Sequence, residues 1–272
     1  MALTSSGTLA FSTIKGEFGG GSSNISLSEY YRDPEGVVSG NNTDVPSGGN
    51  SGPISVSDFY SSEFQLYVTY KVIGGGGGGG GGASSGSVSG NPRGASGSSS
   101  TLAEQGTSTG FSTITGSGGT GGLSGHSSYS GSGGNTAGGA SPLTGGGGGA
   151  KGSWSAGAGG DGSAAGAGGG GASGNNASWP SSDGYGGGGG SAGTQQAGSV
   201  YVKPTAVLRL TAGAGGTGYD SHADGGDGYQ GYVSVTVRAP GTDGTWTDTK
   251  QSATQTSAGN SDVTIADTAY TG

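Results

Sequence analysis

The chain has 272 residues, of which 72 are glycine and 28% are hydrophobic, whereas glycine makes up about 7% of an ordinary globular domain. A net charge of −8 with only 10% charged residues gives no basic surface for nucleic acid. No apolar run approaches the roughly 20 residues that span a bilayer. The absence of cysteine excludes disulfides, thiolate metal sites and a cysteine nucleophile. Residues 1–11 lack a basic region followed by an apolar one, so we expect no signal peptide, which argues against a secreted matrix protein.

A repeated unit marks the N-terminal region, and we expect residues 1–61 to form a small module. Small residues, an apolar-Ser-apolar-Ser alternation, an acid and an aromatic pair occur at Asn24–Tyr31 and again at Ser51–Tyr60. The alternation indicates short strands, but Ser28 and Ser57 could instead each cap one helical turn. We interpret the aromatic residues as anchors of a small core rather than as a ligand site: Tyr30, Tyr31, Phe59 and Tyr60.

Clean alternation of apolar and polar residues predicts strands over Phe64–Ile73 and Gly231–Arg238. A further strand region spans Val200–Thr211, with Pro204 at a break or a sheet edge. The predicted fold class is mainly β, with a β-sandwich-like domain over residues 62–240. The last residues, 241–272, form a C-terminal extension that either adds one strand at Asp262–Ala266 or drapes over another subunit.

The predicted strands flank a glycine-rich insertion, residues 74–199, which opens with the nine consecutive glycines Gly74–Gly82. Its aliphatic residues are few, nearly all of them Val88, Leu102, Ile114, Leu123 and Leu143. Such a segment buries too little apolar surface to offset the entropy of ordering, which favours a disordered linker. Alternatively, glycine permits extended helices with three residues per turn, which pack through backbone contacts in place of a hydrophobic core. No strict glycine period runs through the stretch, so collagen is excluded. We expect the flanking strands to pair and to carry the stretch as one long excursion.

Catalytic signatures are weak. No Gly-x-Ser-x-Gly elbow and no P-loop lysine lies between a predicted strand and a predicted helix. The acidic residues are scattered through loops, so the sequence does not identify a carboxylate pair for glycoside cleavage. We therefore expect no enzyme activity and no cofactor. The most pointed cluster is an Asp-x-His-x-Asp-Gly spacing that resembles a calcium loop but lacks the downstream bidentate glutamate. A glycine-rich turn explains it equally well, so we predict no metal and keep four residues as weak candidates: Asp220, His222, Asp224 and Asp227.

Two parts of the sequence resemble proteins of tailed bacteriophages. The N-terminal sequence, including Ile25–Tyr31 and Gly52–Tyr60, resembles a module found on many tail and virion structural proteins. The strand ending at Ile73 before the glycines, the stretch Leu208–Gly216 and the closing Gly231–Val235 resemble the glycine-rich domain of phage tail fibres. These matches cover about 60% of the chain. They imply a virion protein of the tail, assembled in the host cytoplasm, that acts as a tail-fibre or tail-tip adhesin.

Some phage adhesins similarly arrange polyglycine-type helices in layers and bind the host through loops at their tips. Aromatic residues at such turns would suit a host glycan or an outer-membrane protein, because they give large contact areas at little entropic cost. An alternative is that they fill gaps between glycine helices. The candidates are His126, Tyr129, Trp154, Trp179 and Tyr185, with Asn175, Asn176 and Asp183 nearby.

The expected partners are other tail or baseplate proteins and the host surface, without nucleic acid. We expect a homo-oligomer, taken as a trimer, because weak single contacts gain from multivalency. Two other classes remain open: a structural component without receptor binding, such as a baseplate spacer or head decoration, and a depolymerase.

Overall fold

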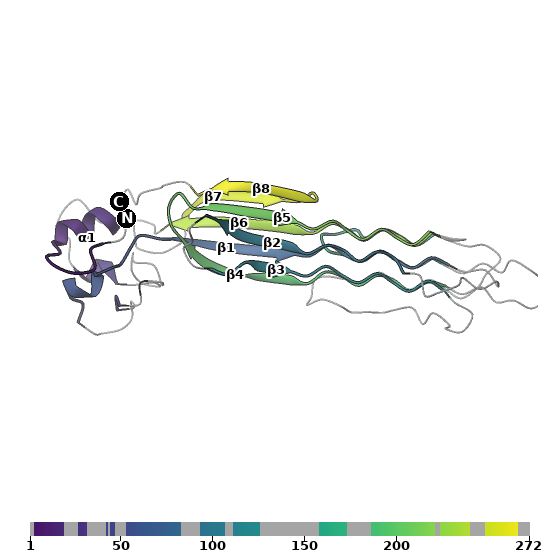
Figure 1. The fold of residues 1–272 in the computed structure, drawn as a ribbon, viewed down its shortest axis with the longest axis horizontal. Helices are drawn as coiled ribbons and strands as arrows, with labels where there is room; N and C mark the ends of the chain where they lie inside the picture. The colour runs from purple at the N-terminus through teal and green to yellow at the C-terminus, as the bar shows by residue number, and fades with distance from the viewer. Residues whose placement is uncertain are drawn as a thin grey trace, which may run out of the picture.

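A computed structural model describes the fold of the chain (Figure 1). The described residues are 3–18, 27–31, 42, 44–46, 53–82, 93–106, 111–125, 158–172, 186–220, 224–239 and 248–265. The molecule is elongated (Figure 1). Short helices lie at one end, two β-sheets follow, and glycine-rich segments continue from the strands to the other end. No helix in the described part is long and apolar enough to cross a membrane.

The helical end is held together by aromatic rings from α1 (Phe11–Phe18), η1 (Leu27–Tyr30) and η2 (Val56–Phe59). The ring of Tyr30 makes edge-on contacts with Phe11, at 5.7 Å between centroids, and with Phe59, at 6.2 Å. Tyr30 and Phe59 are fully buried, which confirms their expected role in a small core. The other two residues predicted for this core, Tyr31 and Tyr60, are only half-buried.

Of the two conformations that the repeated unit allows, the described residues adopt the helical one. In η2 the N-cap is Ser55 rather than Ser57: the Ser55 hydroxyl accepts the Ser57 N–H, and Asp58 accepts the Ser55 N–H at 2.8 Å. This reciprocal pairing is a capping box, which satisfies donors that a single short turn cannot satisfy internally. Helix α1 has no counterpart among the sequence-based predictions.

The predicted mainly-β class is confirmed, because in the described part of the chain eight strands form two four-stranded antiparallel sheets. The first sheet has the order β4 (Gln195–Val202), β1 (Leu66–Ile73), β6 (Tyr232–Ala239) and β7 (Asp248–Gln255). The second has the order β3 (Ile114–Gly116), β2 (Ser100–Gln105), β5 (Val207–Ala212) and β8 (Gly259–Thr264).

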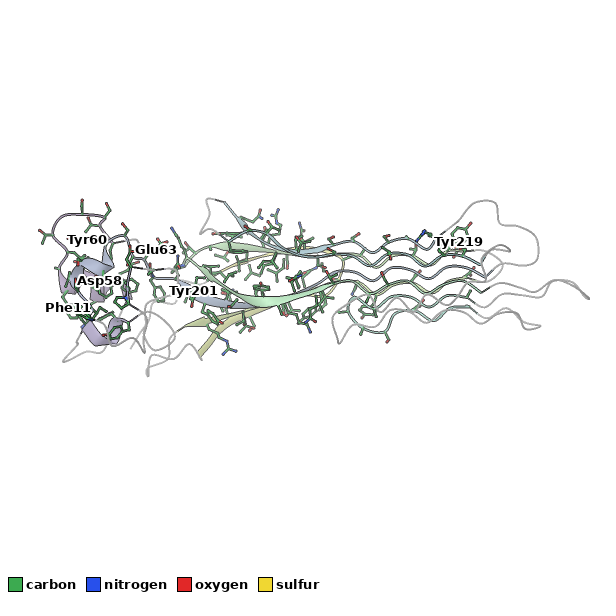
Figure 2. The ribbon with its side chains drawn as sticks, turned by 90° about the horizontal axis from the view of Figure 1, so that it is seen from below. Phe11, Asp58, Tyr60, Glu63, Tyr201 and Tyr219 are labelled. Atoms are coloured by element: carbon green, nitrogen blue, oxygen red, sulfur yellow. The ribbon has the colours of Figure 1, made fainter. Side chains whose placement is uncertain are left out.

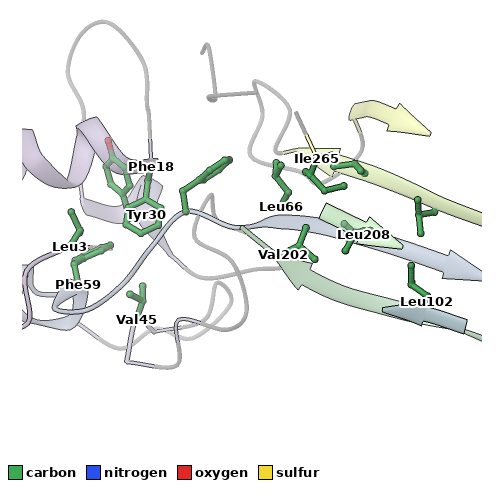
Figure 3. Close-up of a cluster of buried hydrophobic side chains, with 14 of the residues drawn as sticks. Leu3, Phe18, Tyr30, Val45, Phe59, Leu66, Leu102, Val202, Leu208 and Ile265 are labelled. Atoms are coloured by element: carbon green, nitrogen blue, oxygen red, sulfur yellow. The ribbon is translucent and has the colours of Figure 1, made fainter. Parts of the chain in front are cut away.

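The two sheets share one apolar core, which continues into the helical end (Figure 3). Alternate residues of β1, β5 and β6 point into it, as expected when one face of a sheet is buried. Thus Val68 and Val72 on β1 are fully buried, whereas Thr69 and Lys71 between them are only half-buried. The core residues contributed by the strands and by the residue after β8 are Leu66, Val68, Val72, Leu102, Val202, Leu208, Leu210, Val233, Val235, Val237 and Ile265.

The flanking strands do pair, as expected, because β1 pairs with both β4 and β6. The glycine-rich stretch does not form a single excursion between β1 and β4, so that part of the expectation is wrong. The chain returns to the second sheet as β2 and β3, where Leu102 and Ile114 supply the apolar side chains. A second departure follows β3 and returns to β4, and a third, shorter one joins β5 to β6. Each departure leaves one sheet and comes back to the other, so the strands of both sheets lead directly into glycine-rich segments (Figure 1).

Hydrogen bonds join the helical end to the sheets at Glu63. The side chain of Asn42, 8% exposed, donates to the Glu63 carbonyl at 2.9 Å and accepts the Glu63 N–H at 3.1 Å. The neighbouring Phe64 N–H donates to the Glu17 carboxylate of α1 at 2.9 Å. Lys203, just after β4, pairs with the Glu63 carboxylate at 2.9 Å. These contacts therefore hold the residues just before β1 against the helical end on one side and against the residue after β4 on the other.

Candidate recognition end of the glycine segments

We call the described residues 74–82, 93–99, 117–125, 158–172, 186–194, 213–220 and 224–231 the glycine array. Segment 74–82 lies at its centre, and its N–H groups follow a repeat of three residues. Gly74, Gly77 and Gly80 donate to segment 186–194, Gly75 and Gly78 donate to segment 93–99, and Gly76 and Gly79 donate to segment 224–231. Successive residues therefore point one third of a turn apart.

The carbonyl groups of the central segment follow the same repeat toward three other neighbours. Gly75, Gly78 and Gly81 accept from segment 117–125, Gly76 and Gly79 accept from segment 213–220, and Gly77 and Gly80 accept from residues 167–172. The central segment thus has six neighbours, three as acceptors and three as donors. All seven N–H groups of Gly74–Gly80 are paired, at 2.8–3.1 Å.

The close approach of these neighbours requires glycine. A Cβ atom built on any residue of Gly74–Gly80 would lie 1.9–2.1 Å from a backbone carbonyl oxygen of a neighbouring segment. No real Cβ contact is that short, so a side chain would force the segments apart. Hydrogen bonds and close backbone packing here replace the apolar side chains that order the sheets.

Solvent-facing side chains recur every third residue in two outer segments, and the buried side chains of the array are small ones: Ala167, Ala172, Ala192 and Ser124. In segment 117–125 the exposed positions are Ser117, Thr120 and Leu123, and in segment 213–220 they are Ala214, Thr217 and Asp220. Each is three residues from the next, and the residues between them are glycines that point into the array, except for Tyr219. A local Gly-Gly-x period is therefore present in segment 117–125 and over part of segment 213–220, although no single period runs through the whole stretch.

All segments of the array begin or end at its far end, away from the sheets (Figure 1). Outward-running segments end there at Gly82, Gly125, Ala172 and Asp220, and inward-running ones start at Arg93, Ala158, Gly186 and Asp224. Tyr219 lies near this end, and its N–H donates to the Gly79 carbonyl at 2.9 Å (Figure 2).

The five predicted contact residues lie outside the described residues. His126, Tyr129 and Trp154 belong to the connection from Gly125 to Ala158, and Trp179 and Tyr185 belong to the connection from Ala172 to Gly186. The nearby Asn175, Asn176 and Asp183 fall in the second of these connections. Both connections therefore start and finish at the far end of the array.

The weak metal candidates are accounted for only in part. Asp220 and Asp224 are exposed, and His222 lies outside the described residues. The Asp227 carboxylate accepts the Gly218 N–H at 2.7 Å, and the Asp227 N–H donates to Asp161 at 2.9 Å. Asp227 thus bridges neighbouring segments. Across the described ranges no group of three His, Cys, Asp or Glu residues could hold a metal ion.

Two exposed apolar side chains were not singled out by the sequence. Leu123 on segment 117–125 is 43% exposed, and Tyr229 on segment 224–231 is 40% exposed. The Gly-Gly-x spacing around Leu123 is the signal that could have identified it, because the residue between glycine pairs is the one that faces outward.

Comparison with known proteins adds no further constraint, since no family model, no curated protein and no solved structure matches the chain.

Proposed function

We propose that this chain is a tail or baseplate protein of a phage virion, and specifically a tail-fibre or tail-tip adhesin that recognises the host cell surface. The glycine array would be a lobe of polyglycine-II helices that holds recognition loops away from the particle. The observation that supports this proposal most is that all seven N–H groups of Gly74–Gly80 and the carbonyls of Gly75–Gly80 are hydrogen-bonded to six neighbouring segments. A core built from backbone alone places no demand on the side chains of the connections.

The backbone geometry supports the helix type. A three-residue repeat of hydrogen-bond directions corresponds to three residues per turn. Among the described glycines of the array, only Gly166, at the turn between residues 158–163 and 167–172, has a positive φ. Negative φ values with three residues per turn describe the left-handed helix of the polyproline-II family.

Residues 1–61 would form the attachment module. Its described residues pack around Tyr30 and Phe59 at the end of the molecule opposite the far end of the array (Figures 1 and 2). The hydrogen bonds at Glu63 fix this module to the sheets. A rigid rod with a fixed junction suits a protein that binds the particle at one end and the host at the other.

The contacts would be made by aromatic side chains in the connections at the far end, in particular Trp154 and Trp179. Large rigid side chains bury much area for little entropy loss, and several copies per particle, taken as a trimer, would multiply weak contacts. The proposed role is binding without catalysis, and the proposal invokes no cofactor.

The test is adsorption competition. Purified folded protein is titrated against susceptible host cells, and its binding is measured together with adsorption of the parent phage. The proposal expects saturable binding and a matching loss of adsorption. Folded protein that neither binds the cells nor slows adsorption would overturn the adhesin role and favour a structural virion component. Release of soluble sugar from the cells would favour a depolymerase instead.

A further inference from the structure

The four edge strands of the two sheets differ in how they discourage pairing with another chain. A free edge presents unpaired N–H and C=O groups, which natural proteins protect with short strands, charges or bulges. β3 has three residues, β7 carries Asp248 and Lys250 with a register irregularity opposite Val237 and Arg238, and β8 carries Asp262 in an ion pair with Arg209.

β4 has none of these protections. Its eight residues, Gln-Gln-Ala-Gly-Ser-Val-Tyr-Val, contain no charged residue and no proline. They pair with β1 in an unbroken register from Gln195 to Val202. No described strand lies on the other side of β4, and the four residues from Gln196 to Ser199 are exposed. β4 is therefore an uncharged strand in unbroken register, and it lies at the edge of the described sheet.

We propose that this edge pairs with β4 of a second copy in the free protein, with the two strands antiparallel about a two-fold axis. Opposite residues in such a ladder must face the same side of the sheet, so the axis must pass through a residue of β4. With the axis at Gly198, Ala197 faces Ser199 of the second copy, and Gln196 faces its Val200.

The self-pairing is compatible with the side chains involved. Ala197, Gly198 and Ser199 are small, so the two backbones can approach at the centre. No like charges meet across the junction, since the strand is uncharged throughout. The two first sheets would join into one continuous sheet of eight strands.

The inference is independent of the proposed function. β4 runs along the long axis of the molecule, so antiparallel pairing would direct the two glycine arrays in opposite directions (Figure 1). The dimer would thus be the state of the free protein, and mounting several copies side by side on a particle would require this edge to be released.

Disulfide trapping tests the pairing directly, because the natural chain has no cysteine. The double variant Ala197→Cys/Ser199→Cys places thiols within bonding reach whether the axis passes through Gly198 or Ser199. The matched control is Ser252→Cys/Thr254→Cys, which has two exposed residues on the other edge strand of the same sheet. Mild oxidation should give a covalent dimer of the β4 variant and leave the β7 variant monomeric.

Sedimentation equilibrium of protein without added cysteines is the second readout. Wild type and Ser252→Lys should both dimerise with rising concentration, whereas Ser199→Lys should weaken the dimer at least tenfold, because two lysines would face the same junction. Far-UV circular dichroism checks the fold of each variant. If Ser199→Lys does not fold, disulfide trapping alone decides the question. Monomeric wild type at all concentrations, or equal cross-linking of both double variants, would overturn the proposal.

Discussion

A Cβ atom placed on Gly76 would lie 1.9 Å from the carbonyl oxygen of Ala167, on a neighbouring segment of the array. We predict that Gly76→Ala lowers the free energy of unfolding by at least about 3 kcal/mol, because the surrounding backbone cannot move aside without breaking hydrogen bonds. Gly160→Ala is the control, since a Cβ there meets nothing within 4 Å, and it should stay within about 0.5 kcal/mol of wild type. Urea denaturation measures both, and equal effects of the two variants would contradict the close packing.

A second prediction concerns the junction between the helical end and the sheets. Asn42→Ala removes both side-chain partners of the Glu63 backbone, and we expect a loss of about 2 kcal/mol because a sheltered N–H and C=O lose their hydrogen bonds. Asn260→Ala, at an exposed residue of β8, is the matched control and should change stability by less than about 0.5 kcal/mol. Thermal unfolding checks both, and a harmless Asn42→Ala would show that the junction contributes nothing.

A third prediction concerns acid. Arg209 donates two hydrogen bonds to Asp262, each at 2.8 Å, and chiefly for this reason the pKa of Asp262 lies below its ordinary value. The unfolded chain therefore takes up the proton first as the pH falls. The contribution of the pair is complete above the ordinary carboxyl pKa of about 4 and disappears as the pH falls through the folded value.

Because both side chains are exposed to solvent, we expect this contribution to be small and to weaken with added salt. The stability difference between wild type and Asp262→Asn should be present at neutral pH and vanish in acid. Arg209→Gln should reproduce this loss, and the double variant should lose no more than either single one. A stability difference that grows in acid would contradict the assignment.

A fourth prediction rests on the proposed function. Trp154→Ala and Trp179→Ala should each weaken binding to host cells at least tenfold, because large aromatic side chains dominate contact energies. Trp246→Ala is the matched control, since Trp246 lies in the connection from the end of β6 to the start of β7, both of which lie near the helices rather than at the far end of the array. Cell-binding isotherms measure the three variants. Equal binding by all three variants would show that Trp154 and Trp179 do not belong to the recognition surface.

Sequence patterns predicted the strands whose side chains alternate. The expected strand Phe64–Ile73 corresponds to β1, the region Val200–Thr211 divides into β4 and β5 around Pro204, and Gly231–Arg238 corresponds to β6. The alternative of a strand near Asp262–Ala266 is realised as β8. In each of these, apolar residues every second position report one buried face.

The missed elements lack that signal. β7 reads Asp-Thr-Lys-Gln-Ser-Ala-Thr-Gln, because an edge strand buries few side chains. β2 and β3 have few apolar residues and lie within glycine-rich sequence, so the composition of this stretch gave no signal for a strand. For the array, the choice between disorder and packed helices depends on backbone hydrogen bonds between segments as distant as Gly76 and Tyr229, which no local pattern encodes.

The most direct test of the account is hydrogen exchange at the amides of Gly74–Gly80, followed by NMR. If backbone hydrogen bonds to six neighbours form the core of the array, these seven amides should exchange only through global unfolding, as slowly as those of the central strand β1. The exposed residue Ser96 on an outer segment provides an internal reference for fast exchange. Exchange of the central glycines as fast as this reference would contradict the account.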